Sequence, residues 1–200
     1  HVDPYTRLVS WSDEILHSLQ QHLDNAETLI FHNSQFDMRG LELIGIKIRH
    51  LWEKVEDTQV MSHIICPGDM SKKKVIPAAN HALKKLAFKY FGWKDDEEKR
   101  LEEAVKAART EGERKGYCVA KYGHPFFPTA KKGSKFWKAD YWLVPEICLE
   151  YAFGDVERTL LLWREFKKAV QRDQMTAVYK ERKAQLRILY DITNTGMQMD

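Results

Sequence analysis

The sequence predicts a helix-rich α/β fold. Several segments place apolar residues at helical spacing between recognisable start and stop signals, whereas one short apolar run is typical of a buried strand. The helix–strand–helix order near the beginning of the chain favours α/β, although strands are sparse. The 200 residues suit one domain, or one domain with an appendage, and 44% hydrophobic residues can form a sizeable core.

The N-terminal part of the chain predicts two helices and two strands. The first helix is expected to begin after Ser10 or Ser12, because either hydroxyl can act as its N-cap. The apolar run 28–32 (TLIFH) predicts a buried strand. A second helix is expected over 33–45, ending at a glycine, and the alternation at 46–48 (IKI) predicts another short strand.

The middle of the chain predicts two further helices and a charged segment. A helix over about 59–65 is stopped by a Pro-Gly pair, and a lysine-rich loop follows over 68–78. The next helix carries four apolar residues at helical spacing and ends at Gly92. In residues 94–115, opposite charges four positions apart predict an exposed helix rather than a core element, and residues 116–144 are expected to be irregular.

Two long helices are predicted in the C-terminal part. Pro145 suits the first turn of a helix over about 145–171. A final helix over about 174–192 ends at the turn signal 194–196 (NTG). We expect the first of these helices to turn one apolar stripe inward, formed by Val156, Leu160, Trp163 and Val170.

Charge and cysteine content narrow the class of protein. The net charge of +3 is too small to indicate nucleic-acid binding by itself, but segments 72–74 and 131–138 are local basic clusters. The second cluster interleaves aromatic residues with lysines, which suits phosphates and bases, although a solvated loop explains it equally well. Three scattered cysteines argue against a disulfide framework and fit a reducing, cytoplasmic setting. No apolar run approaches the roughly 18 residues of a membrane helix, and no signal peptide is visible.

Two short strings, 33–37 (NSQFD) and 151–155 (YAFGD), carry the clearest chemistry. In each, a polar residue lies four positions before an aspartate, so both side chains can share one face of a helix. Asp37 and Asp155 could hold magnesium or manganese, which prefer oxygen ligands, and two such ions about 3.5–4 Å apart hydrolyse phosphodiesters. Tyr151 could orient the attacking water, since a phenol with a pKa near 10 is a poor base at neutral pH.

Taken alone, each string is a weak signal. Asn33 could simply cap a helix, and Tyr151 could be an ordinary core tyrosine. These structural interpretations stay open beside the catalytic one.

Four landmarks in a fixed order strengthen the catalytic interpretation. The first string follows the strand at 28–32, and Asp57 and Thr58 then precede a helix. A leucine-rich helix follows at 81–87 (HALKKLA), and the second string continues into a Thr-Leu pair at 159–160. This order resembles the second and third motifs of the proofreading 3′→5′ exonucleases, the DEDDy group of the DnaQ-like, ribonuclease-H-type superfamily.

The end of the chain carries a second resemblance. Residues 184–200 are similar to the connector that leads into the polymerase domain of family A DNA polymerases. The resemblance therefore implies a partial 3′→5′ exonuclease domain of a phage-like family A polymerase over 1–172. It implies a ribonuclease-H-like exonuclease fold, N-terminally truncated, with 173–200 leading toward a polymerase domain. We interpret 94–144 as an insertion that could lie beside a nucleic-acid groove.

The resemblance also assigns roles to individual residues. Asp37 and Asp155 match metal-ligand positions for two divalent ions, Mg or Mn, in the intact parent, and Tyr151 matches the water-orienting tyrosine. Asn33 and Phe36 match substrate-binding positions beside the site, although we expect Phe36 to pack against its helix rather than touch substrate. The implied partners are the single-stranded 3′ end of DNA and the remainder of the polymerase chain, with no membrane, in a bacterial or phage-infected cell.

Other polar residues near the motifs are expected to be structural. Asp57 should cap the helix that follows it. His32 and His81 should be packing or surface histidines, and we assign no catalytic role to Arg158.

One motif of the family is missing. Its members carry an Asp-x-Glu on the first strand, and residues 1–9, which precede the first predicted helix, do not supply it. The chain begins with His rather than Met, which we interpret as a piece of a longer protein. Without these two carboxylates the metal site lacks about half its ligand charge, so the chain alone is expected to be nearly inactive.

Two alternatives remain open. The chain could be a non-catalytic DNA-binding or scaffold domain of a polymerase that has lost nuclease function. It could also belong to an RNA-trimming exonuclease of the same superfamily, although this does not explain the polymerase-like end.

Overall fold

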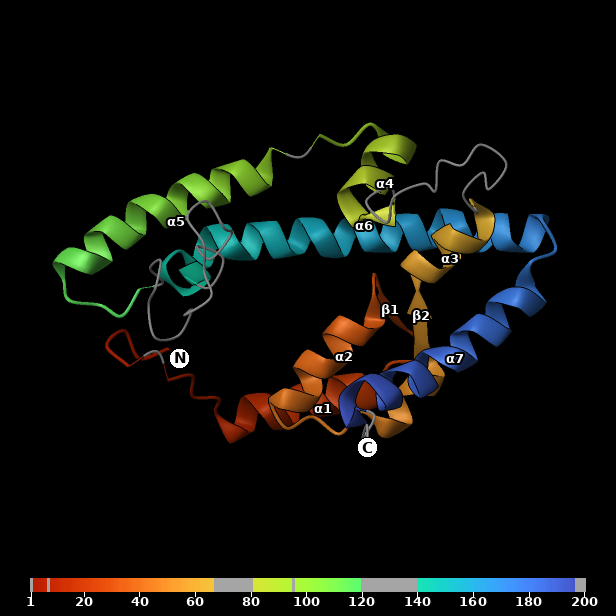
Figure 1. The fold of residues 1–200 in the computed structure, drawn as a ribbon, viewed down its shortest axis with the longest axis horizontal. Coiled ribbons are helices and arrows are strands. Elements are labelled where there is room, and N and C mark those ends of the chain that lie inside the picture. Colours follow the sequence, from red (N-terminus) through yellow and green to blue (C-terminus); the bar gives the residue numbers. More distant parts are fainter. Residues whose placement is uncertain (1, 7, 67–80, 95, 120–139, 197–200) are drawn as a thin grey trace. The chain divides into compact units, whose positions relative to one another are not determined.

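The computed structural model describes residues 2–6, 8–66, 81–94, 96–119 and 140–196. The chain divides into two compact units. Unit 1 consists of His1–Trp11 and Lys94–Val156, and unit 2 consists of Ser12–Trp93 and Glu157–Asp200. The long helix α6 (Pro145–Arg172) contributes residues to both units (Figure 1).

Unit 2 is built around a parallel pair of three-residue strands, β1 (Leu29–Phe31) and β2 (Val55–Asp57). The register places Leu29 beside Val55 and Phe31 beside Asp57. Because the strands are parallel, both end at the same edge, where helices α2 and α3 begin (Figure 1). The helical elements of this unit, besides the second part of α6, are α1 (Asp13–Asn25), α2 (Ser34–Leu43), the 3₁₀ helix η1 (Arg49–Lys54), α3 (Thr58–Ile65), α4 (Leu83–Phe91) and α7 (Thr176–Thr195).

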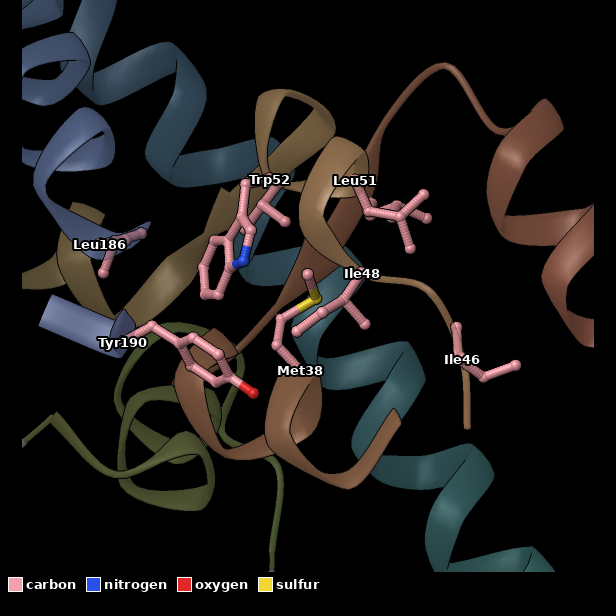
Figure 2. Packing of buried hydrophobic residues seen from close by; sticks show 9 residues of the cluster. Met38, Ile46, Ile48, Leu51, Trp52, Leu186 and Tyr190 are labelled. Carbon is pink, nitrogen blue, oxygen red and sulfur yellow. The ribbon is translucent and has the colours of Figure 1, made fainter. Parts of the chain in front are cut away.

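Two apolar clusters hold unit 2 together. In the first, the Trp52 and Tyr190 rings lie 5.1 Å apart, and Met38 and Leu51 are fully buried. Figure 2 shows these side chains converging from α2, η1 and α7. The second cluster joins α3, α4, α6 and α7 through Met61, Leu86, Leu162, Phe166, Val170 and Tyr179. Burial of this kind contributes roughly 1.5–3 kcal/mol per large side chain, so α7 is an integral part of this core.

Several predicted helix ends are confirmed. Ser12 caps α1 by accepting a hydrogen bond of 3.2 Å from the Ile15 backbone N–H. α6 begins at Pro145, where the missing backbone N–H costs nothing. α4 ends at Gly92 and α7 at Gly196, both with positive φ angles (65° and 72°) that glycine adopts without strain.

The strand predicted at 46–48 is wrong. Ile46 and Ile48 are both buried in the first cluster, so the alternation is real, but among the described residues no strand pairs with this segment, and it leads directly into η1. The sheet partner of β1 is instead β2, a segment whose acidic residues gave no strand signal.

Unit 1 contains α5 (Glu97–Arg114) and residues 145–156 of α6. The prediction that this charged helix is exposed and outside any core is wrong in part. Leu101 and Val105 are fully buried, and α6 residues such as Ile147 pack against them. The expected charge pairing is present on the outer face, where Lys106 contacts Glu102 one turn away.

The inward stripe predicted for α6 is shifted. Val156 is 65% exposed rather than buried, whereas Val170 is buried as expected. The buried residues of α6 are Arg158, Thr159, Leu162, Phe166 and Val170. Arg158 is accommodated because its guanidinium lies over the Trp93 ring, 4.6 Å from the ring centre.

Some predictions fall outside the described residues: the loop at 68–78, the basic clusters at 72–74 and 131–138, and most of the irregular segment 116–144. Cys66, Cys118 and Cys148 are free thiols. Within the described ranges, none of the helices combines the length and apolar character needed to cross a membrane.

Candidate active site

A single buried carboxylate organises the edge of the sheet where α2 and α3 begin. Asp57, the last residue of β2, accepts a hydrogen bond of 2.7 Å from the backbone N–H of Ser34 and one of 3.3 Å from that of Asn33. It also accepts 2.8 and 3.3 Å hydrogen bonds from the backbone N–H groups of Gln59 and Val60. We call this arrangement the Asp57 clamp. It places one negative charge at two helix N-termini, where the helix dipoles stabilise it.

The expected role of Asp57 as the cap of the following helix is confirmed, and its role at α2 was not foreseen. Asn33 occupies the N-cap position of α2, but its side chain makes no capping hydrogen bond. The interpretation of Asn33 as a side-chain cap is therefore wrong, because Asp57 supplies the cap from the neighbouring strand. Asn33 instead turns the chain, with a left-handed φ of 69° that asparagine tolerates better than most residues.

The Asp57 clamp is itself supported from α7. The Asp57 backbone N–H donates to the hydroxyl of Tyr179 at 3.1 Å, and that hydroxyl donates to Glu56 at 2.7 Å. Lys183 pairs with the other Glu56 oxygen at 2.8 Å. Burial raises the pKa of Tyr179, so the phenol remains a hydrogen-bond donor at any ordinary pH.

Asp37 lies one turn into α2, directly beyond the Asp57 clamp. Its side chain is half-buried, and burial together with the negative charge of Asp57 raises its pKa to about 6. Carboxyl groups with pKa values raised in this way are concentrated at functional sites. A cation bound beside Asp37 would oppose both effects and favour the ionised form.

Asp37 borders a cavity of about 540 Å³. Phe36 lies at the same cavity and is 77% exposed, so the expectation that it packs against its own helix is wrong. The remaining lining is mainly apolar and includes Phe31, Leu41 and Leu43. The cavity therefore combines an exposed aromatic face with one carboxylate.

The histidines near this site have structural contacts, as expected. The Nε2–H of His32 donates to the His81 carbonyl oxygen at 2.9 Å, and its Nδ1 lies 2.9 Å from the Thr58 hydroxyl. Because a carbonyl only accepts, Nε2 carries the proton. Burial lowers the pKa of His32, and the His81 ring stacks on His63 with 3.7 Å between ring centres.

The second string lies on α6 in unit 1. Tyr151 and Asp155 are four residues apart in a continuous helix, so they share one face, as expected. Tyr151 packs against the Leu101–Val105 cluster, with its ring 6.4 Å from that of Tyr141. This packing gives Tyr151 a structural role and fixes the position of its ring.

The structure thus gathers Asn33, Phe36 and Asp37 at one edge of unit 2, and it places Tyr151 with Asp155 on one helix of unit 1. The convergence of the two strings stays a prediction. No protein-family model matches the chain, and no curated protein or solved structure shows significant similarity to it.

The metal-binding capacity of the described residues is limited. Nowhere in this part of the chain do three or more His, Cys, Asp or Glu side chains come together in a way that could hold a metal ion. Asp57 is committed to four backbone N–H groups. Asp37 is therefore the carboxylate of this edge that could coordinate a cation, and it would need further oxygen ligands from elsewhere.

The raised pKa of Asp37 predicts a pH-dependent cost to stability. The folded protein holds the Asp37 proton more tightly than the unfolded chain does. Asp37 therefore contributes to the free energy of unfolding at low pH, and this contribution is lost as the pH rises through about 6. We expect Asp37→Asn to raise the free energy of unfolding by about 1–2 kcal/mol at pH 8, allowing for solvent screening, and by almost nothing below about pH 4.

Urea denaturation of both proteins across this pH range measures the difference. Asp191→Asn, at an exposed carboxylate of α7, is the matched control and should show no comparable gain. An Asp37→Asn effect that does not change with pH would contradict the assigned pKa.

Proposed function

We propose that this chain carries the second and third motifs of a 3′→5′ exonuclease that removes mismatched nucleotides from DNA, as part of a family A type DNA polymerase. The observation that carries the proposal is the state of Asp37. It is a half-buried carboxylate with a pKa raised to about 6, held at the start of α2 beside an exposed aromatic ring. An ionised carboxylate in this position lowers the free energy of unfolding, which a bound cation would offset. The exposed ring beside it suits a nucleotide base.

The roles of the residues follow from their chemistry. Bound at Asp37 and Asp155, two divalent ions would supply hydroxide from water and stabilise the leaving oxygen. The Asp57 clamp fixes the first turn of α2, and thereby the position of Asp37. Phe36 offers its ring to the terminal base, and Asn33 lies at the turn that precedes it. Tyr151, immobilised by packing, orients water without deprotonating it.

A non-catalytic DNA-binding domain is the second candidate. One observation favours it: Tyr151 packs in an apolar cluster. An aspartate with a raised pKa that had lost its metal partners would still weaken the fold, so the Asp37→Asn experiment does not separate the two candidates. Cleavage does.

The proposal predicts magnesium-dependent exonuclease activity in the product of the complete reading frame that contains this sequence. With a labelled primer annealed to a template, we expect faster removal of a mismatched 3′ nucleotide than of a paired one, and no removal when a chelator replaces magnesium. The 200-residue chain alone should be nearly inactive, because the residues it carries before α1 contain no Asp-x-Glu pair of carboxylates.

The same assay distinguishes the alternatives. Absence of cleavage by the complete protein would overturn the proposal in favour of a DNA-binding domain. Preferential trimming of an RNA 3′ end would indicate the RNA-processing branch of the same superfamily. Vigorous cleavage by the isolated chain would show that the Asp-x-Glu motif is dispensable.

A further inference from the structure

A basic and aromatic surface lies on unit 2 where α4 packs against the second part of α6. Leu86 of α4 and Phe166 of α6 belong to the same buried cluster, and Figure 1 shows α4 lying against α6. α4 together with the α6 stretch 163–172 carries seven basic side chains and one acidic one. This net charge of +6 exceeds the +3 of the whole chain, so positive charge is concentrated here.

The surface contains a groove rather than only scattered lysines. A cavity of about 500 Å³ is lined by Phe91 at the end of α4 and, along α6, by residues that include Trp163, Arg164, Lys167 and Lys168. The Lys167 ammonium lies 4.5 Å from the centre of the Trp163 ring, which holds this cation at the groove. The Trp163 indole N–H is itself buried and has no hydrogen-bond partner among the described residues.

Aromatic side chains of α4 are exposed, and one of them, Phe91, lines the groove with these cations. Phe91 is 38% exposed and Phe88 is 59% exposed. Phe91 lies at the end of α4, next to lysine and arginine side chains. Exposing its apolar ring to water is unfavourable, and the ring offers a flat face for stacking. The groove therefore combines phosphate-attracting charge with a stacking surface.

We propose that this groove binds single-stranded nucleic acid, with the backbone phosphates at Arg164, Lys167 and Lys168 and a base stacked on Phe91. The positive charge of the groove favours a polyanion. The exposed ring favours a nucleic acid whose bases are free to stack, which is a single strand and not a duplex. The surface lies outside the Asp37 cavity, so binding does not depend on the exonuclease proposal.

Fluorescence anisotropy with labelled oligothymidylate and oligouridylate of about 16 nucleotides tests the inference on the 200-residue chain. A chelator is present throughout, so cleavage cannot contribute. We expect Lys167→Glu combined with Lys168→Glu to weaken binding at least 10-fold at about 0.1 M salt, and to reduce the slope of log K against log salt by about 1.4. Phe91→Ala should weaken it roughly 5- to 100-fold with little change in the slope.

The matched control reverses the same number of charges elsewhere: Lys106→Glu on α5 combined with Lys180→Glu on α7, both exposed positions. Circular dichroism verifies the fold, and Lys167→Gln with Lys168→Gln replaces the reversal if that variant does not fold. Equal weakening by the two double reversals, no effect of Phe91→Ala, or tighter binding of a duplex or of polyglutamate than of either single strand would overturn the inference.

Discussion

Replacement of Asp57 by alanine is expected to lower the free energy of unfolding by about 3–5 kcal/mol. The substitution leaves four backbone N–H groups without their acceptor, two at α2 and two at α3, in a place where Asp57 itself is only 2% exposed. Each lost cap typically costs about 1 kcal/mol, and buried donors left unpaired cost more. Because a small domain is stable by only about 5–15 kcal/mol, this loss is a large fraction of the free energy of unfolding.

Urea denaturation followed by circular dichroism measures the global effect. Native-state hydrogen exchange at the Ser34 and Gln59 amides measures the local one, since these two groups make the shortest contacts, at 2.7 and 2.8 Å. Asp57→Asn keeps one acceptor oxygen and should lose less. Asp191→Ala on the exposed face of α7 should cost under about 0.5 kcal/mol. A loss below about 1 kcal/mol for Asp57→Ala would show that the clamp is not needed.

Replacement of either Asp37 or Asp155 by alanine is expected to abolish most of the exonuclease activity. We expect Asp37→Ala and Asp155→Ala each to reduce magnesium-dependent removal of a mismatched 3′ nucleotide by the complete protein at least about 10³-fold, because metal ligands act as a unit. Asp37→Ala should not lower stability, because it removes an unfavourable buried charge. A folded Asp155→Ala protein with near-normal cleavage would remove Asp155 from the proposed site.

The control for this prediction is the neighbouring carboxylate Glu157, two residues along α6 and exposed. Glu157→Ala makes the same chemical deletion in the same helix but on another face. It should leave cleavage within a few-fold of the unmodified protein. A comparable loss there would indicate that α6 is simply sensitive to substitution.

The helices were predictable because their signals are local. The serine that caps α1, Pro145 at the start of α6 and the glycines that end α4 and α7 each act on adjacent backbone groups. The strands depended on tertiary context. Val55–Asp57 is a strand only because Leu29–Phe31 lies beside it. In the alternating 46–48 segment, the backbone N–H and carbonyl of Lys47 bond instead to the side chain of Gln20.

The burial of α5 illustrates a second limit of local patterns. Leu101 and Val105 are two apolar residues among many charges, which predicts a solvated helix. Four-residue spacing nevertheless puts both on one face, and the start of α6 covers that face. A narrow apolar stripe was enough to bury the helix on one side.

At the candidate site, the sequence singled out Asp37 but not what positions it. Asp57 was expected to cap α3, since an Asp-Thr pair before a helix is a local signal. Its contact with Ser34 joins residues 23 positions apart and follows only from the parallel register of β1 and β2. The raised pKa of Asp37 likewise results from burial and from the nearby charge of Asp57, which are both consequences of the tertiary structure.

Asp37 and Asp155 are proposed to serve one metal-dependent site, and a variant that combines both substitutions measures whether they do. Cleavage of a mismatched 3′ end is measured for Asp37→Ala, Asp155→Ala and the two combined in the complete protein. If both ligate the same metal centre, the double variant should be no slower than the worse single one, within a few-fold. A double variant whose loss is the product of the two single losses would contradict a shared site.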